Sequence, residues 1–482
     1  MSESSASPKC AGVSCRSSDT GRWTALLSVA VAWFVIGLMS ASSACGSDHA
    51  DPIDPFNRER LEGGITDLFV FPVTRDDKPV VPFERKAGVQ LAPSDPLTDI
   101  VREPLTAEQL KEIDAVVFIL CVRRQLTQAG SLKLEPYTYR IHIDVDSAVD
   151  VPGADDLKKE KETYAHVSDP GGVGYNARPG DKGQERPTLL ESFVRYGGRV
   201  ITPSEINEEI TMEFRLKNDA TFQDDSPRYS GPAAAGWKNS EISRAAGVFD
   251  DPFIFPAFFG TNVVAMAVRV PRDLLPQTGS FLIWATSHEG DRQIDHVGRS
   301  LRTQNPRFEL LNTLHPSEHV RAIEEERENP SLMRDLFLRF NFAQEFAYRS
   351  WDLAPDVMCY TPSYPVGYPN GRLLTDDVAA MLAQYGDTLL YELSWQNGNG
   401  RWPRQQTNDK TVDARAAGRF KPNFPFLLEP HPEKDPPPPL QLTAASMWKL
   451  LGIAAMLLLL LAIENVIVAK LYHRFKLRKR YL

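Results

Sequence analysis

The stretch from His288 to His296 gathers the side chains most able to do chemistry. It holds two histidines and three carboxylates within nine residues: His288, Glu289, Asp291, Asp295 and His296. Imidazole and carboxylate groups bind divalent metals and act as general acids and bases. The stretch follows an apolar segment, so a polar hairpin turn that faces water is the structural alternative.

Two further groups of residues are candidate metal ligands. Asp144 and Asp146 alternate with apolar residues at the end of a strand pattern, a spacing that suits Ca²⁺, although the glycine of a sharp calcium loop is missing. The stretch "DHADPIDP" offers His49 and Asp51, which equally fit a flexible turn. No other cofactor is expected.

Most catalytic motifs are absent from the sequence. It contains no GxSxG, HExxH, GxxxxGK[ST] or CxxC pattern. We therefore predict a non-catalytic protein. A hydrolase whose carboxylate and histidine come from separate loops stays open as an alternative.

Six segments carry the apolar patterns of strands, and helical patterns come later in the chain. The strands are Ile65–Val73, Ala115–Val122, Tyr139–Val145, Ile210–Leu216, Asn262–Val270 and Ser280–Ser287. This order predicts a mainly β (α+β) fold, with a two-sheet core and helices grouped toward its C-terminal side.

Two helix starts can be read from their capping residues. Ser317 is expected to cap a helix that stops before Pro330. In "YPNGRLLTDDVAAML", Asn370-Gly371 predicts a turn and Thr375 caps a helix, with Arg372 free to pair with Asp376.

The first 45 residues are typical of a secretory signal or an uncleaved signal anchor. Basic residues precede an uncharged apolar run that ends in small residues and Cys45, a candidate lipidation site. The exported domain would then span residues 46–421, with a flexible insertion at 147–187. Residues 422–443 are rich in proline and predict a stiff stalk.

Residues 446–470 are apolar and long enough to predict a transmembrane helix. Trp448 and Lys449 would anchor its outer end, and a basic cytoplasmic tail at 471–482 its inner end: Arg474, Lys476, Arg478, Lys479 and Arg480. This topology predicts a single-pass protein of the bacterial inner membrane, with most of the chain in the periplasm. Glu464 and Asn465 would contact a partner helix within the bilayer, or lie near the cytoplasmic interface.

Charge and cysteine content add two constraints. The leader carries +1 and the segment from Thr443 carries +6, which leaves −16 on the exported part of a chain of net charge −9. An acidic domain is a poor candidate for binding nucleic acid. Cys121 and Cys359 are the two cysteines of the exported domain, and either a disulfide or buried thiols fit.

Several stretches together resemble the bacterial family catalogued as domain of unknown function 4331. They are "SDHADPIDP", "ITDLFVFP", "YRIHIDVD", "FDDPFIFPAFFGTNVVAMAVRVP", "FLIWATS" and "YPNGRLLTDDV", which occur in the family's order and cover most of Asp48 to Gln384. The resemblance implies a secreted or surface-associated domain and lends no reaction. The glycine-rich turn after "HIDVD" and the C-terminal segment depart from it.

These observations predict a membrane-tethered subunit of a membrane protein complex, whose periplasmic domain binds partner proteins. Its partners would be the other subunits and the lipid bilayer. A periplasmic module that binds a metal or a small ligand is the alternative.

Overall fold

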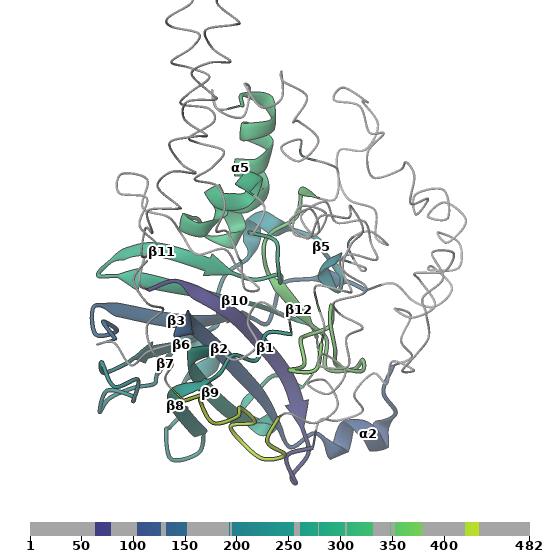
Figure 1. Ribbon diagram of the computed structural model, residues 1–482. Coiled ribbons are helices and arrows are strands. Elements are labelled where there is room, and N and C mark those ends of the chain that lie inside the picture. Colours follow the sequence, from purple (N-terminus) through teal and green to yellow (C-terminus); the bar gives the residue numbers. More distant parts are fainter. Residues whose placement is uncertain are drawn as a thin grey trace, which may run out of the picture. The chain divides into compact units, whose positions relative to one another are not determined.

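One of the two larger sheets has four antiparallel strands (Figure 1). The computed structural model describes residues 63–78, 104–126, 132–151, 192, 195–254, 261–277, 279–303, 306–330, 348, 352–376, 378 and 420–432. The sheet has the order β1-β2-β9-β8, from Ile65–Val73, Ala115–Leu126, Asn262–Pro271 and Ser243–Asp250. Every residue of β1 is buried.

The second sheet has six strands in the order β11-β10-β3-β6-β7, and β12 also pairs with β10. Its strands are β3 Tyr137–Asp144, β6 Ile210–Arg215, β7 Arg228–Ser230, β10 Phe281–Glu289, β11 Arg292–Val297 and β12 Met358–Tyr360. A separate two-stranded ribbon pairs β4 Val149–Asp150 with β5 Arg199–Val200.

The two larger sheets share one hydrophobic core, as in a β-sandwich. Ile141 of β3 and Met212 of β6 belong to the same buried cluster as Phe118 of β2 and Val268 of β9. The alternation along β6 is strict, with buried residues at every second position. One face of this strand therefore packs on the core, and the side chains of the other face point away from it.

Helices are short and few in the described part of the chain. The α-helices are α2 Ala107–Glu112 and α5 Pro316–Glu328, and the 3₁₀ helices are η1 Pro203–Glu205, η2 Pro232–Ala234, η4 Arg272–Leu274 and η5 Pro306–Thr313. Thr106 and Gln109 form a capping box at α2. His315, not the predicted Ser317, is the N-cap of α5, which ends before Pro330 as expected.

The predicted fold class is wrong in two respects, although its β-rich character agrees. Helices are not grouped toward the C-terminal side, because α2 lies between β1 and β2. No helix among the described residues has the length and apolar character needed to cross a bilayer, so the transmembrane helix of that fold class is not seen. Residues 446–470, the leader, the basic tail and most of the predicted insertion lie outside the described residues.

The chain divides after His431 into two units, and the contacts below lie in the first. Residues 420–431 contribute side chains to the hydrophobic core of the first unit. Phe426 and Leu427 are buried in the shared cluster, and the Leu428 carbonyl accepts a hydrogen bond from the Asp250 amide at 3.2 Å. The start of the stretch interpreted as a stalk therefore packs on the four-stranded sheet.

Candidate functional site

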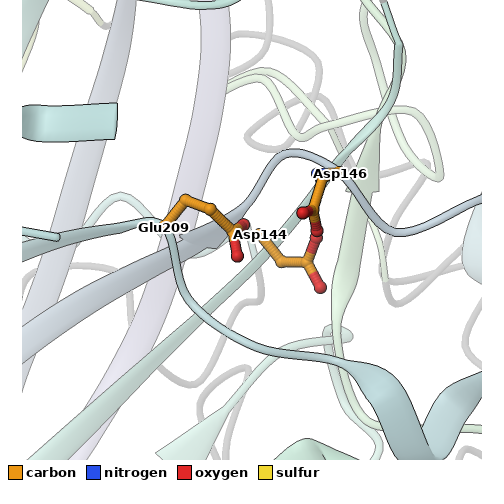
Figure 2. A group of neighbouring side chains, drawn as sticks. All are labelled: Asp144, Asp146 and Glu209. Carbon is orange, nitrogen blue, oxygen red and sulfur yellow. The ribbon is translucent and has the colours of Figure 1, made fainter. Parts of the chain in front are cut away.

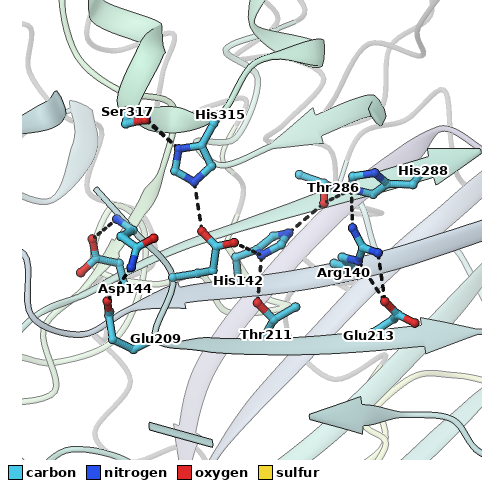
Figure 3. Close-up of polar contacts among 12 residues, drawn as sticks. Arg140, His142, Asp144, Glu209, Thr211, Glu213, Thr286, His288, His315 and Ser317 are labelled. Atoms are coloured by element: carbon cyan, nitrogen blue, oxygen red, sulfur yellow. Dashed lines mark hydrogen bonds and ion pairs between the residues drawn. The ribbon is translucent and has the colours of Figure 1, made fainter. Parts of the chain in front are cut away.

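The outer face of the six-stranded sheet carries a row of polar side chains (Figure 3). The register places His142 of β3 opposite Thr211 of β6 and Trp284 of β10. Arg140 lies opposite Glu213 and Thr286 in the same way. Since residues two apart on a strand share a face, these side chains gather away from the core.

His142 lies at the centre of this row. Its Nδ1 lies 3.2 Å from the Thr211 hydroxyl and its Nε2 lies 2.9 Å from the Thr286 hydroxyl. The ring stacks on Trp284 with centroids 5.2 Å apart. Burial lowers the pKa of His142 to about 3, although Glu208 acts to raise it. The imidazole is therefore neutral at neutral pH, and both of its nitrogens are engaged.

His288 continues the row along β10. Its Nε2 lies 3.0 Å from the Thr286 hydroxyl and 3.4 Å from Nη1 of Arg140. Arg140 in turn pairs with Glu213 at 3.0 Å. Burial lowers the pKa of His288 to about 4, and the charge of Arg140 lowers it further. A neighbouring guanidinium makes this an unfavourable place for a metal cation.

A carboxylate, an imidazole and a hydroxyl form a second hydrogen-bonded group at the edge of the same face. Nε2 of His315 lies 3.1 Å from Oε2 of Glu208, and Nδ1 of His315 lies 2.8 Å from the Ser317 hydroxyl (Figure 3). The His315 and Trp284 rings form a T-shaped pair, with centroids 5.5 Å apart and an angle of 86° between the ring planes. The hydrogen bond from His315 holds the pKa of Glu208 below its usual range, although burial opposes this.

A pocket of about 400 Å³ lies beside Ser317. Its apolar lining includes Leu282, Leu353 and Val357, and its serine residues are Ser192, Ser204 and Ser317. Leu282 and Val357 also belong to a small buried cluster with Trp284. The pocket is therefore built on the outer face of the six-stranded sheet, against the start of α5.

Asp144, Asp146 and Glu209 bring three carboxylates within 4.8 Å of one another (Figure 2). Burial raises the pKa of Glu209, and the charges of the two aspartates raise it further. The Asp144 oxygens are already occupied, because they accept hydrogen bonds from Asp146 N, Ser147 N, Ser147 Oγ and Asn207 N. Those bonds leave Asp144 little capacity to bind a cation.

His296 of β11 belongs to a fully buried cluster of charged and titratable groups with Asp356 and Arg302. Nε2 of His296 lies 2.8 Å from the Asp356 carbonyl oxygen and 3.4 Å from the Asp356 carboxylate. Nη1 of Arg302 lies 4.0 Å from Oδ1 of the same carboxylate. The Asp356 amide donates to Nδ1 of His319 at 3.1 Å. Burial acts to raise the pKa of Asp356, but His296 and Arg302 hold it below its usual range. Burial keeps the pKa of His319 well below its usual value.

The candidate metal ligands of the β10–β11 hairpin do not converge on one site. His288 contacts Arg140 and Thr286, whereas His296 contacts Asp356. The exposed polar loop of the alternative interpretation is limited to the turn, since Asp295 and His296 are fully buried. Asp144 and Asp146 do lie together, and they are joined by Glu209. His49 and Asp51 lie outside the described residues.

Of the two possibilities left open for Cys121 and Cys359, the disulfide is not formed. Cys121 belongs to the shared core between the sheets, and Cys359 belongs to the separate cluster under the pocket. Cys359 contacts the Thr361 hydroxyl at 3.9 Å, and burial raises its pKa to about 12. The alternative of buried thiols is the one observed.

Known sequence motifs did not identify the hydrogen-bonded group of Glu208, His315 and Ser317. Glu208 lies 107 residues before His315, and neither belongs to a known catalytic motif. The one local signal is "HPS", in which proline starts a helix directly after an imidazole. Glu464, Asn465, Trp448, Lys449 and Cys45 lie outside the described residues, so their predicted roles stay predictions. No family model, no curated protein and no solved structure matches this chain.

Proposed function

We propose that the domain is a binding module for a small neutral molecule with an apolar body, held in the pocket beside Ser317. The pocket's volume of about 400 Å³ and its mixed lining support this proposal. Ligand sites are concave and mostly apolar, with a few polar groups that fix orientation. Here Leu353 and Val357 provide apolar contact, and serine hydroxyls provide hydrogen bonds.

The charges around the pocket favour a neutral ligand over an anion. Arg199 pairs with Asp150 at 2.8 Å, and Arg321 pairs with Glu318 at 2.7 Å. Glu324 adds a carboxylate to the lining. Since the guanidinium groups are already paired with carboxylates, an anionic ligand would gain little from them.

The prediction of a membrane-complex subunit rests on Glu464, Asn465 and the tail, which lie outside the described residues. It stays a prediction, as do the leader, the periplasmic location and the family resemblance. Ligand binding by the pocket is compatible with an exported domain and depends on none of them.

Fluorescence of N-phenyl-1-naphthylamine tests the proposal, because this neutral probe brightens in apolar sites. We expect saturable binding that Ser204→Trp abolishes, since Ser204 is an exposed residue of the pocket lining. Ser240→Trp, at an exposed turn outside the pocket lining, is the matched control and should leave binding unchanged. Equal binding by both variants would place the probe elsewhere and contradict the proposal.

A further inference from the structure

We propose that Ser317 is a nucleophile that hydrolyses small neutral esters, with His315 as its general base and Glu208 as the positioning carboxylate. The inference rests on the proposed function, because the ester would occupy the pocket that Ser317 lines. A hydroxyl, an imidazole and a carboxylate in hydrogen-bonded sequence are recognised by geometry and role, not by their order in the chain.

The hydrogen bonds fix which nitrogen of His315 carries the proton. The Ser317 amide, which can only donate, lies 3.3 Å from Nδ1 of His315. Nδ1 must therefore be an acceptor, so in the neutral ring the proton resides on Nε2. Nε2 then donates to Glu208 at 3.1 Å, and Nδ1 presents a lone pair to the Ser317 hydroxyl at 2.8 Å. This is the tautomer that a general base needs.

Glu208 is placed to stabilise the imidazolium that forms in the reaction. Its carboxylate is ionised at neutral pH, because the hydrogen bond from His315 keeps its pKa low. Its second oxygen lies 3.9 Å from His142, which is neutral. Among the residues that the structure describes, His315 is therefore the close partner of Glu208 that can become charged.

Two features place Ser317 for attack on a bound ester. Trp284 packs against the His315 ring in a T-shaped contact, which would limit the rotation of that ring. Ser317 is the second residue of the 13-residue helix α5, so the positive end of the helix dipole lies where negative charge would develop. The acyl chain would lie against Leu353 and Val357 of the pocket.

The reaction balances with water as the only co-reactant. Ser317 Oγ bonds to the ester carbonyl carbon while its proton passes to His315 Nδ1. The carbon–oxygen bond to the alcohol then breaks, and Nδ1 returns the proton to the departing alkoxide. Water, deprotonated by Nδ1, hydrolyses the acyl-serine to a carboxylic acid and free Ser317.

Helix capping is the structural alternative, and the chain allows a clean separation. His315 caps α5 through the backbone amide of Ser317, so Ser317→Ala keeps the cap and removes only the hydroxyl. His315→Asn replaces one capping residue by another and removes the base. If His315 and Ser317 only cap the helix, both variants should keep the wild-type rate of ester hydrolysis and the wild-type stability. If they are catalytic, both variants should lose ester hydrolysis.

The test uses p-nitrophenyl butyrate hydrolysis by the full-length chain, and mass-spectrometric mapping of the adduct formed with diisopropyl fluorophosphate. We expect turnover and an adduct on Ser317. Ser317→Ala and His315→Asn should lose activity by about 10³-fold, and Glu208→Gln by about 10²-fold. Ser240→Ala, an exposed serine outside the pocket lining, should match the wild type. Thermal midpoints should stay within a few degrees for every variant.

Two results would overturn the inference: a wild type with neither turnover nor adduct, or a Ser317→Ala variant that keeps its activity. The binding proposal is judged separately. N-phenyl-1-naphthylamine binding by the wild type is the separate measurement, so binding by a wild type that shows neither turnover nor adduct refutes the hydrolase alone. Turnover that Ser204→Trp does not affect would instead refute the pocket as the binding site.

Discussion

Arg372 and Asp67 form an ion pair across 305 residues of sequence, with Nη2 of the arginine 3.1 Å from Oδ1 of the aspartate. Both side chains are fully buried, and the guanidinium lies 4.0 Å from the centroid of the Phe69 ring. The backbones of Arg372 and Val70 also exchange two hydrogen bonds, at 2.8 and 3.1 Å. The motif "YPNGRLL" therefore closes on the edge of β1.

Arg372→Met should destabilise the fold by about 3–5 kcal/mol, because it leaves the Asp67 carboxylate buried without the guanidinium. Arg292→Met is the matched control. Arg292 pairs with Glu289 in an exposed turn, so its loss should cost under about 1 kcal/mol. Urea unfolding followed by circular dichroism measures both. Equal costs would mean that the buried pair contributes no more than the exposed one.

Gly371→Ala should cost several kcal/mol more than Gly290→Ala. Both glycines have a positive φ, +67° and +61°, so backbone strain is matched and costs about 1–2 kcal/mol in each. A Cβ at Gly371 would lie 2.6 Å from the Val70 carbonyl oxygen, whereas a Cβ at Gly290 meets nothing within 4 Å. Equal unfolding midpoints for the two variants would contradict the close approach of this motif to β1.

The fold should lose stability as pH falls below about 6.5. Burial lowers the pKa of His142 to about 3 and that of His288 to about 4, so the folded state favours the neutral rings. Their contribution is complete above the unfolded pKa of about 6.5. It is lost toward pH 3–4, because in that window the unfolded chain binds protons that the folded chain does not.

His142→Gln tests the pH dependence directly. It should reduce the slope of unfolding free energy against pH, between pH 6 and pH 4, by up to about 1.4 kcal/mol per pH unit. Urea titrations at several pH values give this slope independently of the variant's absolute stability. An unchanged slope would show that His142 takes up its proton equally in both states.

Cys359 should resist alkylation in the folded chain. With its pKa raised to about 12, only about one molecule in ten thousand is a thiolate at pH 8. We expect the Cys359 peptide to stay unlabelled by iodoacetamide in buffer and to label fully in concentrated urea. Mass mapping without reductant should also show no Cys121–Cys359 crosslink. Fast labelling of native Cys359 would contradict its burial.

Asp144→Asn should lower the free energy of unfolding by about 2–3 kcal/mol. The asparagine side-chain amide would point its donor hydrogens toward backbone N–H groups that donate to the Asp144 carboxylate. Asp146→Asn is the control: Asp146 is exposed, and removal of its charge relieves repulsion on Glu209. Millimolar Ca²⁺ should leave the wild-type thermal midpoint nearly unchanged. A rise of several degrees that Asp146→Asn abolishes would instead identify a calcium site.

The strands could be predicted because their signal is local. The expected segment Ile65–Val73 is β1, and Ile210–Leu216 differs from β6 by one residue. Alternation along β6 also identified its buried face. Period-two burial is written in each strand separately and needs no knowledge of its neighbour.

The candidate site depended on strand pairing and loop approach, which no local pattern encodes. The sequence suggested Asp376 as the ion-pair partner of Arg372. The Asp376 carboxylate instead accepts hydrogen bonds from the backbone amides of Tyr368 and Leu373. The Arg372 guanidinium pairs with Asp67. Glu208 met His315 only because the segment before β6 lies beside the start of α5. Composition and periodicity thus determined that this is a β-rich chain. Tertiary structure alone decided which charges are buried together, because that choice depends on contacts between residues a hundred or more positions apart.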